Sequence, residues 1–335
     1  MSSTLPAVPD IDDQLGAEIA ALLGEVEERL RASVATSDDM ARWTARHLMD
    51  AGGKRVRPIL VLLAASLGDM DREEVLDAAV LVELTHLASL YHDDVMDSAS
   101  TRRGADSAHL LWGNNVAILT GDFLFARASA LSARIGVDAV RLHSRTFERL
   151  CLGQLHETVG PTDDDDPFEH YISVLADKTA SLLALAGQLG ASLSDAPTGT
   201  DEIMQRYGEK VGVAFQLADD VLDLGSDAQT SGKTPGIDLR EGVATMPTLL
   251  IRRRAAHGPD PRTREILERL DGDLSSDAAL ERLVLMLRDD PALEETRALA
   301  QRTADEAIEI LFELPSGSVR DALIAFTRAL VERRR

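Results

Sequence analysis

The five residues DDVMD at positions 93–97 and their second copy, DDVLD, at positions 219–223 decide how this sequence is interpreted. Each copy follows an apolar run, LVELTHLASLY in the first case and VGVAFQLA in the second. Residues four apart lie on one face of a helix, so the first and last aspartates of each copy point the same way. Stacked carboxylates repel each other, and at the C-terminus of a helix they also oppose its dipole. Two such arrangements are costly for a fold and therefore indicate cation binding.

The kind of cation follows from the ligands. Magnesium is a hard cation that prefers oxygen donors, and it is usually held by a few carboxylates together with phosphate oxygens. A single motif of this kind is equally consistent with an acidic helix end that is exposed to solvent. Two matching copies favour the interpretation as metal sites.

The composition limits the function and the location of the protein. The 335 residues include 57 acidic and 35 basic side chains, giving a net charge of −22, so nucleic acid is not an expected partner. The single Cys151 excludes an internal disulfide and fits a reducing compartment. The first 14 residues show no secretion signal, and the apolar run Ile59–Leu67 is too short to span a bilayer. We expect a cytoplasmic protein, with peripheral membrane contact left open.

Helical periodicity covers most of the chain, and no alternating pattern of strand length stands out. No proline occurs between Pro58 and Pro161, which permits long helices. The pattern predicts helices over about 11–35, 39–49, 58–67, 72–97, 115–133, 137–159 and 168–193, another ending in the second motif, and more from 244 to 335. Residues 98–108 and 225–242 are predicted as loops, and the second is long enough to act as a lid. We predict an all-α, single-domain helical bundle over residues 1–335, with a flexible N-terminus of about ten residues.

Basic side chains flank both acidic motifs in the sequence. They are Lys54, Arg55 and Arg57, then Arg102 and Arg103, then Lys178 and Lys233. Arginine presents a fork that matches phosphate oxygens, and lysine presents a point charge. Taken singly, each of them is also consistent with an ordinary solvated surface charge. Together with two metal motifs, however, they describe a pocket for more than one diphosphate.

A diphosphate bound in this way is an activated leaving group. Metal and cations neutralise its charge as the C–O bond breaks. If the substrate is allylic, the carbocation that remains needs an apolar cavity without water. A helical bundle can supply that cavity.

At this point the sequence resembles the trans-isoprenyl diphosphate synthases, or polyprenyl synthetases, over nearly its whole length. The resemblance rests on the ordered motifs GGKRVRP, HLASLYHDDVMD, TRRG, GD at 121–122, KTASLL, FQLADDVLD and GKTPGIDLREG. It implies helices around a deep central cavity, a homodimer and three Mg²⁺ ions per active site. It also implies condensation of isopentenyl diphosphate with an allylic diphosphate, by ionisation, attack of the isopentenyl double bond and loss of a proton.

The resemblance assigns roles by position. The first metal motif is Asp93, Asp94 and Asp97, the second is Asp219, Asp220 and Asp223, and the metal ligands among them are Asp93, Asp97 and Asp219. Isopentenyl diphosphate is assigned to Lys54, Arg57, His86 and Arg103. The allylic diphosphate is assigned to Arg102, Lys178 and Lys233. Thr179 and Gln216 are assigned to the nascent carbocation. One departure is Val243, where many relatives have lysine.

The product length is predicted from the residues before the first motif. The positions four and five residues before Asp93 lie one helical turn deeper, and here they are the small Ser89 and Ala88. Short-chain members of the family usually carry a bulky aromatic residue at one of them. We therefore expect a long product, on the order of seven to ten isoprene units by family analogy, of the kind used in quinone side chains such as menaquinone.

Three alternatives are left open. A short-chain synthase with a C15–C20 product would share all the motifs. A class I terpene cyclase would normally carry one DDxxD and a different second motif. The non-catalytic subunit of a heteromeric synthase would tend to lose aspartates or cations, and here almost all are present.

Overall fold

The computed structural model describes residue 8, residues 11–225 and residues 235–332. Nearly all of this part is helical, and its only strands are β1 (Thr101–Arg102) and β2 (Ala105–Asp106). The predicted all-α fold is confirmed. Lys233 lies outside the described residues, as does most of the expected flexible N-terminus.

The chain divides into two compact units. Unit 1 is formed by residues 1–150, 181–209 and 308–326, and unit 2 by residues 151–180, 210–307 and 327–335. Four described helices have residues in both units, namely α7 (Val137–Val159), α10 (Thr200–Gly225), α16 (Pro291–Leu311) and α17 (Ser318–Val331). The expectation that the chain is a single domain stays a prediction.

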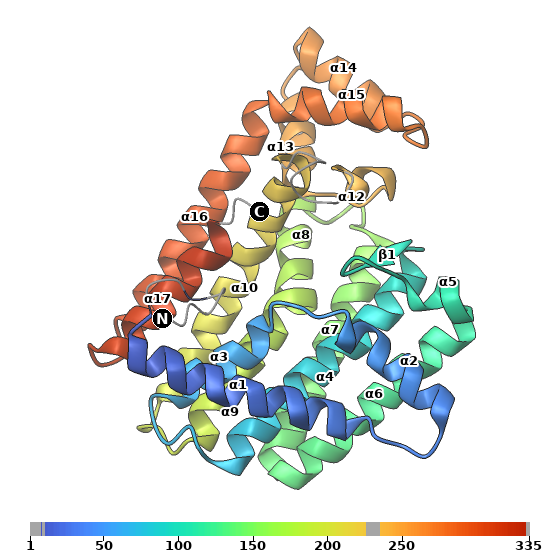
Figure 1. The fold of residues 1–335 in the computed structure, drawn as a ribbon. Helices are drawn as coiled ribbons and strands as arrows, with labels where there is room; N and C mark the ends of the chain where they lie inside the picture. The colour runs from blue at the N-terminus through green and yellow to red at the C-terminus, as the bar shows by residue number, and fades with distance from the viewer. Residues whose placement is uncertain (1–7, 9–10, 226–234, 333–335) are drawn as a thin grey trace. The chain divides into compact units, whose positions relative to one another are not determined.

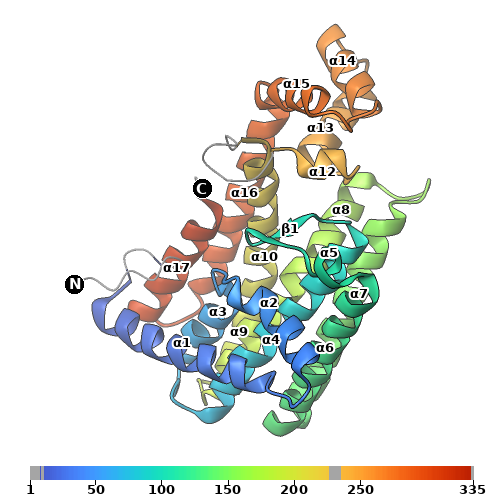
Figure 2. The same ribbon diagram turned by 45° about the vertical axis from the view of Figure 1, so that its right-hand side comes forward.

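Unit 1 is built around α4 (Glu73–Met96), which packs against α6, α3, α9 and α1. Figures 1 and 2 show α1 lying across α3 and α4. The other elements of this unit are α1 (Asp13–Ser33), α2 (Asp39–Asp50), α3 (Val56–Ala65), α5 (Ala108–Trp112), α6 (Asn114–Ile135) and α9 (Ser181–Leu193). Every residue of α4 from Val75 to Thr85 is buried, as expected for a helix that is apolar on nearly all sides.

The last turns of α4 carry the first acidic motif, and their burial is no longer uniform. His86, Ser89 and Asp93 are only partly buried, whereas Ala88 has no exposed surface. These partly buried residues follow one another at helical spacing and so share one face. The helix ends at Met96, and Asp97 caps it with a backbone N–H that donates to the carbonyl oxygen of Asp93 at 2.8 Å.

Unit 2 has its own apolar core, formed by α8, α10 and the helices of the C-terminal third. Its elements are α8 (Pro167–Leu175), the π-helical turn η1 (Ala176–Ala180), α12 (Ile237–Arg240), α13 (Met246–Ala255), α14 (Pro261–Leu270) and α15 (Asp277–Arg288), with parts of α7, α10 and α16. Leu217, Met246, Ile251 and Leu283 are fully buried in this core. The second acidic motif lies in the last turns of α10.

The structure differs from the predicted elements in three places. The helix predicted over 168–193 is interrupted by η1, the loop predicted over 98–108 contains the β1–β2 hairpin, and α12 lies inside the predicted long loop. In addition, α6 is the one described helix that is long and apolar enough to cross a membrane. One face of α6 packs against α4 within unit 1, and 39% of its most apolar window is buried.

Candidate active site

The first acidic motif divides into two kinds of carboxylate. Asp93 and Asp97 are partly buried on one face of α4, whereas Asp94 is completely buried. Asp94 accepts a hydrogen bond of 2.6 Å from Nε of Arg102, and this ion pair holds the arginine against the motif. The outer aspartates thus keep part of their surface exposed, while the second aspartate holds the next element of the chain.

Arg102 reaches Asp94 because the chain turns back in a tight hairpin. Thr101 pairs with Asp106 and Arg102 with Ala105, so Arg103 and Gly104 form a two-residue turn. Both turn residues have positive φ, 55° and 77°, as a type I′ turn requires. A left-handed conformation is unfavourable for arginine, so other contacts must compensate for it.

The guanidinium of Arg103 provides these contacts. Its Nη1 donates to the carbonyl oxygen of Leu48 at 3.0 Å and to that of Gly52, both at the end of α2. The guanidinium lies directly on Gly53, where a Cβ atom would be 2.8 Å from Cζ of Arg103. Gly53 therefore has to be glycine for this close approach, and its φ of 146° also favours glycine.

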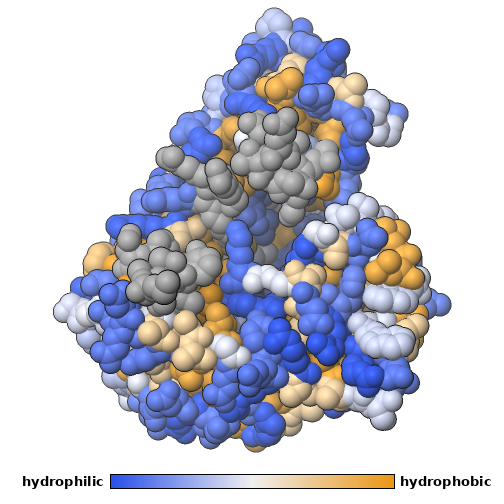
Figure 3. Space-filling model, in the orientation of Figure 1, coloured by the Kyte–Doolittle hydropathy of each residue, from blue (hydrophilic) through white to orange (hydrophobic). Residues whose placement is uncertain are grey.

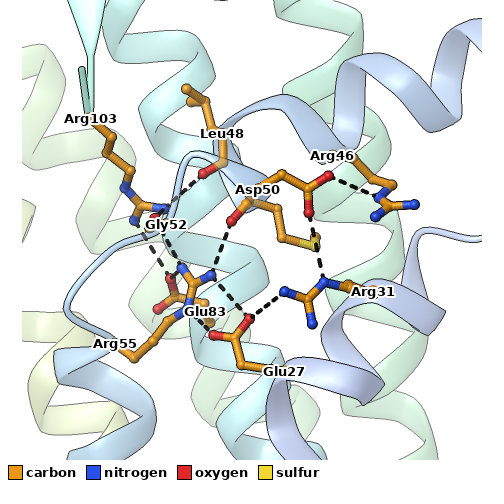
Figure 4. A network of polar contacts seen from close by, with 10 residues as sticks. Glu27, Arg31, Arg46, Leu48, Asp50, Gly52, Arg55, Glu83 and Arg103 are labelled. Atoms are coloured by element: carbon orange, nitrogen blue, oxygen red, sulfur yellow. Dashed lines mark hydrogen bonds and ion pairs between the residues drawn. The ribbon is translucent and has the colours of Figure 1, made fainter. Parts of the chain in front are cut away.

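Arg55 belongs to the same loop but has a structural role. Its five N–H groups make five hydrogen bonds, to Glu83 (2.8 Å), to both carboxylate oxygens of Glu27, and to the carbonyl oxygens of Met49 (3.2 Å) and Gly52 (3.4 Å). An arginine has no more donors than five. Figure 4 shows that the network extends outward through Glu27. Arg55 consequently holds the loop in place and has no donor left for a ligand.

Arg57 and His86 lie close to this loop, and Arg57 contrasts with Arg55 in its hydrogen bonding. The Nε of Arg57 is buried and has no hydrogen-bond partner among the described residues. Burial, with a contribution from Arg103, lowers the pKa of Arg57 to about 10, although Glu83 acts in the other direction. Burial and the charges of Arg57 and Arg103 also lower the pKa of His86 well below its usual value, so its imidazole is neutral. These groups gain hydrogen bonds when an anion binds beside them. The predicted Lys54 is exposed.

The second acidic motif, in unit 2, repeats the division seen in the first. Asp219 and Asp223 are partly buried and Asp220 is buried. Asp220 accepts hydrogen bonds from the hydroxyl of Tyr171 at 2.6 Å and from the backbone N–H of Met246 at 3.0 Å. Burial raises the pKa of Asp220 to about 8, although these two hydrogen bonds act in the opposite direction.

Further predicted residues of unit 2 meet at the π-helical turn. Lys178 and Thr179 lie in η1, and Thr179 donates to Oε1 of Gln216 on α10 at 3.3 Å. Lys178 forms an ion pair with Glu157 on α7. The structure thus brings Thr179 and Gln216 together, as their shared assignment requires. A π-helical turn frequently marks a functional site.

The whole chain is similar to known proteins. The polyprenyl synthetase family model matches residues 39–284. The chain belongs to the polyprenyl synthetase family. It is 41% identical over 334 residues to nonaprenyl diphosphate synthase of Mycobacterium tuberculosis, covering 99% of this chain and 98% of that protein.

Two solved structures of the polyprenyl synthetase family resemble the whole chain. The polyprenyl synthase of Caulobacter crescentus, complexed with calcium and isoprenyl diphosphate, is 34% identical with a TM-score of 0.88, covering 100% of this chain and 99% of that one. The geranylgeranyl pyrophosphate synthase of Corynebacterium glutamicum, in a complex with the same two ligands, is 39% identical with a TM-score of 0.83, covering 96% and 98%. The similar proteins therefore include both long-chain and shorter-chain enzymes.

The residues predicted to set chain length in this synthetase differ in their surroundings. Ala88 has no exposed surface, and its carbonyl oxygen would lie 3.1 Å from a Cβ placed on Gly121 of α6. Ser89 is partly buried and shares the face of α4 that carries Asp93. Phe125 of α6 packs against Phe147 of α7 with ring centroids 4.3 Å apart. Ser89 is thus the more accessible of the two small residues.

The donor groups of the two motifs decide whether a metal ion would fit this site. Among the described residues, no three His, Cys, Asp or Glu side chains gather into a ready-made metal site. Each motif does present two partly buried carboxylates one turn apart, Asp93 with Asp97 and Asp219 with Asp223. This donor set fits a hard cation that completes its shell with water and phosphate.

Sequence reasoning did not identify three polar residues that hold the site together. The sequence does contain a signal for Glu83, because an acidic residue within an apolar helical run must be paired when it is buried. Tyr171 and Glu157 gave none, because their partners are 49 and 21 residues away. Their roles depend on packing between helices, which the sequence does not reveal.

Proposed function

We propose that this chain is a Mg²⁺-dependent prenyltransferase that condenses isopentenyl diphosphate with an allylic diphosphate into a long-chain all-trans polyprenyl diphosphate. Its main support is the contrast in unit 1 between the saturated Arg55 and the buried, unpartnered Nε of Arg57 beside a metal motif. A buried donor without a partner is unfavourable, and a diphosphate oxygen would satisfy it.

In unit 1, Arg57, Lys54 and the neutral His86 would bind the diphosphate of isopentenyl diphosphate. Because His86 is neutral, it can orient the substrate with a hydrogen bond and without additional charge. Arg103 can contribute its charge while its Nη1 stays on the carbonyl oxygens of Leu48 and Gly52. The pair of Arg102 and Asp94 keeps a cation beside the first motif, where the allylic diphosphate is assigned.

In unit 2, Lys178 would bind the allylic diphosphate, as would Lys233. Glu157 positions Lys178, and Thr179 and Gln216 present polar oxygens to the nascent carbocation. Asp93, Asp97 and Asp219 would hold the Mg²⁺ ions, which neutralise the charge of the departing diphosphate. The side chains described here include no evident general base, so the released diphosphate takes the proton.

The product is long because no bulky residue precedes the first motif at the position of Ser89. A product of seven to ten units by family analogy suits the side chain of a quinone such as menaquinone. One observation supports the alternative of a C15–C20 product, namely the likeness to a geranylgeranyl pyrophosphate synthase. Incubation with farnesyl diphosphate, labelled isopentenyl diphosphate and Mg²⁺ separates the two, since a product that stops at C15 or C20 refutes the long-chain proposal.

The same assay tests the enzyme class. The purified chain alone is expected to be active, to lose activity with EDTA and to regain it with excess Mg²⁺. A terpene cyclase would consume the allylic substrate without isopentenyl diphosphate. A non-catalytic subunit would show no turnover until a second protein is added.

We also propose that the enzyme is a cytoplasmic homodimer. Unit 1 exposes large apolar side chains on two consecutive helices, with Leu110 and Leu111 on α5 and Ile118 and Leu119 on α6. Figure 3 shows apolar residues at the surface where α5 lies. A second copy of the chain would cover this patch. Leu119, 65% exposed, is the residue to change. Sedimentation should show a dimer for the native chain and a monomer for Leu119→Glu, whereas a monomeric native chain would refute the proposal.

A further inference from the structure

The buried carboxylate of Glu83 lies where two loops of unit 1 meet. Glu83 is 1% exposed and stands on α4 one turn before His86. It accepts a hydrogen bond of 2.8 Å from Nη1 of Arg55 and lies 3.6 Å from Nη2 of Arg103. Arg55 belongs to the loop between α2 and α3, and Arg103 to the β1–β2 turn. One carboxylate thus connects two segments that are far apart in the sequence (Figure 4).

Both loops adopt conformations that need support. Arg55 and Arg103 have φ values of 48° and 55°, in the left-handed region that is unfavourable for residues other than glycine. Two arginines held beside each other also repel. Burial lowers the pKa of Arg103, and the charge of Arg55 lowers it further, while Glu83 opposes both effects. Glu83 therefore compensates for the repulsion that closure of the two loops creates.

The groups that need this support lie next to it in the chain. Arg57 follows Arg55 by two residues and lies in the first turn of α3, so the position of its guanidinium depends on the placement of the loop. His86 stands one turn after Glu83 on the same helix. The buried Nε of Arg57 has no hydrogen-bond partner among the described residues, so the loop that carries Arg57 decides where its guanidinium points.

We propose that Glu83 is a positioning residue for the isopentenyl diphosphate site, acting through Arg55 and Arg103. This inference rests on the proposed function. A positioning role and a simple electrostatic effect predict opposite changes in the affinity for isopentenyl diphosphate when the charge of Glu83 is removed. A buried negative charge beside several cations weakens the binding of an anion, so its removal should strengthen binding if charge alone matters. If Glu83 instead positions the loops, its removal should weaken binding.

The test uses Glu83→Gln, with Asp77→Asn as matched control. Asp77 is also a buried carboxylate of α4, and it pairs with two arginines, Arg29 (3.3 Å) and Arg134 (2.8 Å). We expect Glu83→Gln to raise the KM for isopentenyl diphosphate by about tenfold, equivalent to about 1.4 kcal/mol. The KM for the allylic substrate and kcat should change by less than about threefold, equivalent to about 0.6 kcal/mol. Asp77→Asn should leave both KM values unchanged.

A binding measurement without turnover supports the kinetics. Calorimetric titration of isopentenyl diphosphate without an allylic primer should show the same weakening for Glu83→Gln. Should this variant fold poorly, Glu83→Asp keeps the charge but is too short to hold both arginines, and its affinity should lie between those of the native chain and the glutamine variant.

Three outcomes separate the hypotheses. Tighter binding by Glu83→Gln would overturn the positioning role in favour of a charge effect. An affinity loss no larger than that of Asp77→Asn would show that Glu83 only stabilises the fold. If the native chain itself neither binds nor consumes isopentenyl diphosphate, the proposed function fails, whatever the variant does.

Discussion

The buried His143 of α7 allows a quantitative prediction about stability in unit 1. It is 4% exposed, and its Nε2 lies 2.9 Å from the hydroxyl oxygen of Thr85 on α4. The hydroxyl of Thr85 donates to the carbonyl oxygen of Leu81 at 2.8 Å, so the imidazole Nε2–H is the donor to Thr85. The neutral imidazole satisfies this contact, and burial lowers the pKa of His143 to about 4. Protonation thus favours the unfolded chain, where the pKa is about 6.5.

The direction and size of the effect follow from this difference. The stabilisation from the neutral imidazole is complete above pH 6.5 and is lost as the pH falls towards 4, because the unfolded chain binds the proton first. The full effect is about 3.4 kcal/mol. Between pH 7.5 and pH 5.5 the free energy of unfolding should fall by about 1.3 kcal/mol from this residue alone. The lower pH stays above the isoelectric point of 4.7, which limits aggregation.

Urea denaturation followed by circular dichroism at both pH values measures this term. His143→Gln keeps a hydrogen-bond donor but cannot titrate, so the native chain should lose about 1.3 kcal/mol more than the variant between pH 7.5 and 5.5. Comparing the two changes cancels the contribution of every other titrating group. Equal losses in both proteins would refute the assignment of a neutral, buried imidazole.

Three further predictions concern the site. Tyr171→Phe removes the donor to the buried Asp220 and should lower the free energy of unfolding by about 1–3 kcal/mol in urea denaturation. Gly153→Ala places a Cβ 2.6 Å from the backbone nitrogen of Lys178, so η1 must shift and kcat should fall by about tenfold in steady-state assays, equivalent to about 1.4 kcal/mol. Ser89→Phe introduces a bulky side chain on the accessible face of α4 and should shorten the product in chromatographic analysis.

Each of these predictions has a matched control. Tyr207→Phe loses only a bond of 3.3 Å to a backbone carbonyl and should cost less than Tyr171→Phe, and a larger cost would contradict the role given to Asp220. Gly24→Ala adds a methyl group where nothing lies within 4 Å and should preserve kcat, and an unchanged kcat in Gly153→Ala would contradict the strained contact. Ala88→Phe overpacks a buried position and should lower stability more than Ser89→Phe. If only Ala88→Phe shortens the product, the prediction that Ser89 faces the growing chain is wrong.

The features that were predictable from the sequence are local ones. The helical spacing before each aspartate motif placed both motifs at helix ends, where α4 and α10 carry them. The closeness of Thr179 and Gln216 followed from the family resemblance, and the geometry of unit 2 brings them together. Periodicity succeeds here because the apolar face of a helix is written into its own sequence.

The features that escaped prediction depend on contacts between distant segments. The turn at Arg103 and Gly104 lacks the usual Asn-Gly or Asp-Gly signal, and it is stabilised by the carbonyl oxygens of Leu48 and Gly52. The π-helical turn at Lys178 has no sequence signature, since it depends on how closely α7 approaches at Gly153. In both places tertiary packing determines the backbone, so sequence patterns carry no direct record of it.

The geometry of a helix also explains why the two aspartate motifs share a buried second residue. Neighbouring residues of a helix point about 100° apart, so the second aspartate cannot join the face of the first and fifth. It points instead into the packed interior, where an unpaired carboxylate would be very costly. The two copies meet this requirement differently, Asp94 with Arg102 and Asp220 with Tyr171 and the backbone of Met246. Arg102 belongs to β1, Tyr171 lies within α8, and Met246 begins α13. The five-residue motif therefore places two kinds of carboxylate side by side, with its outer carboxylates partly exposed and its second carboxylate bonded to other segments of the chain.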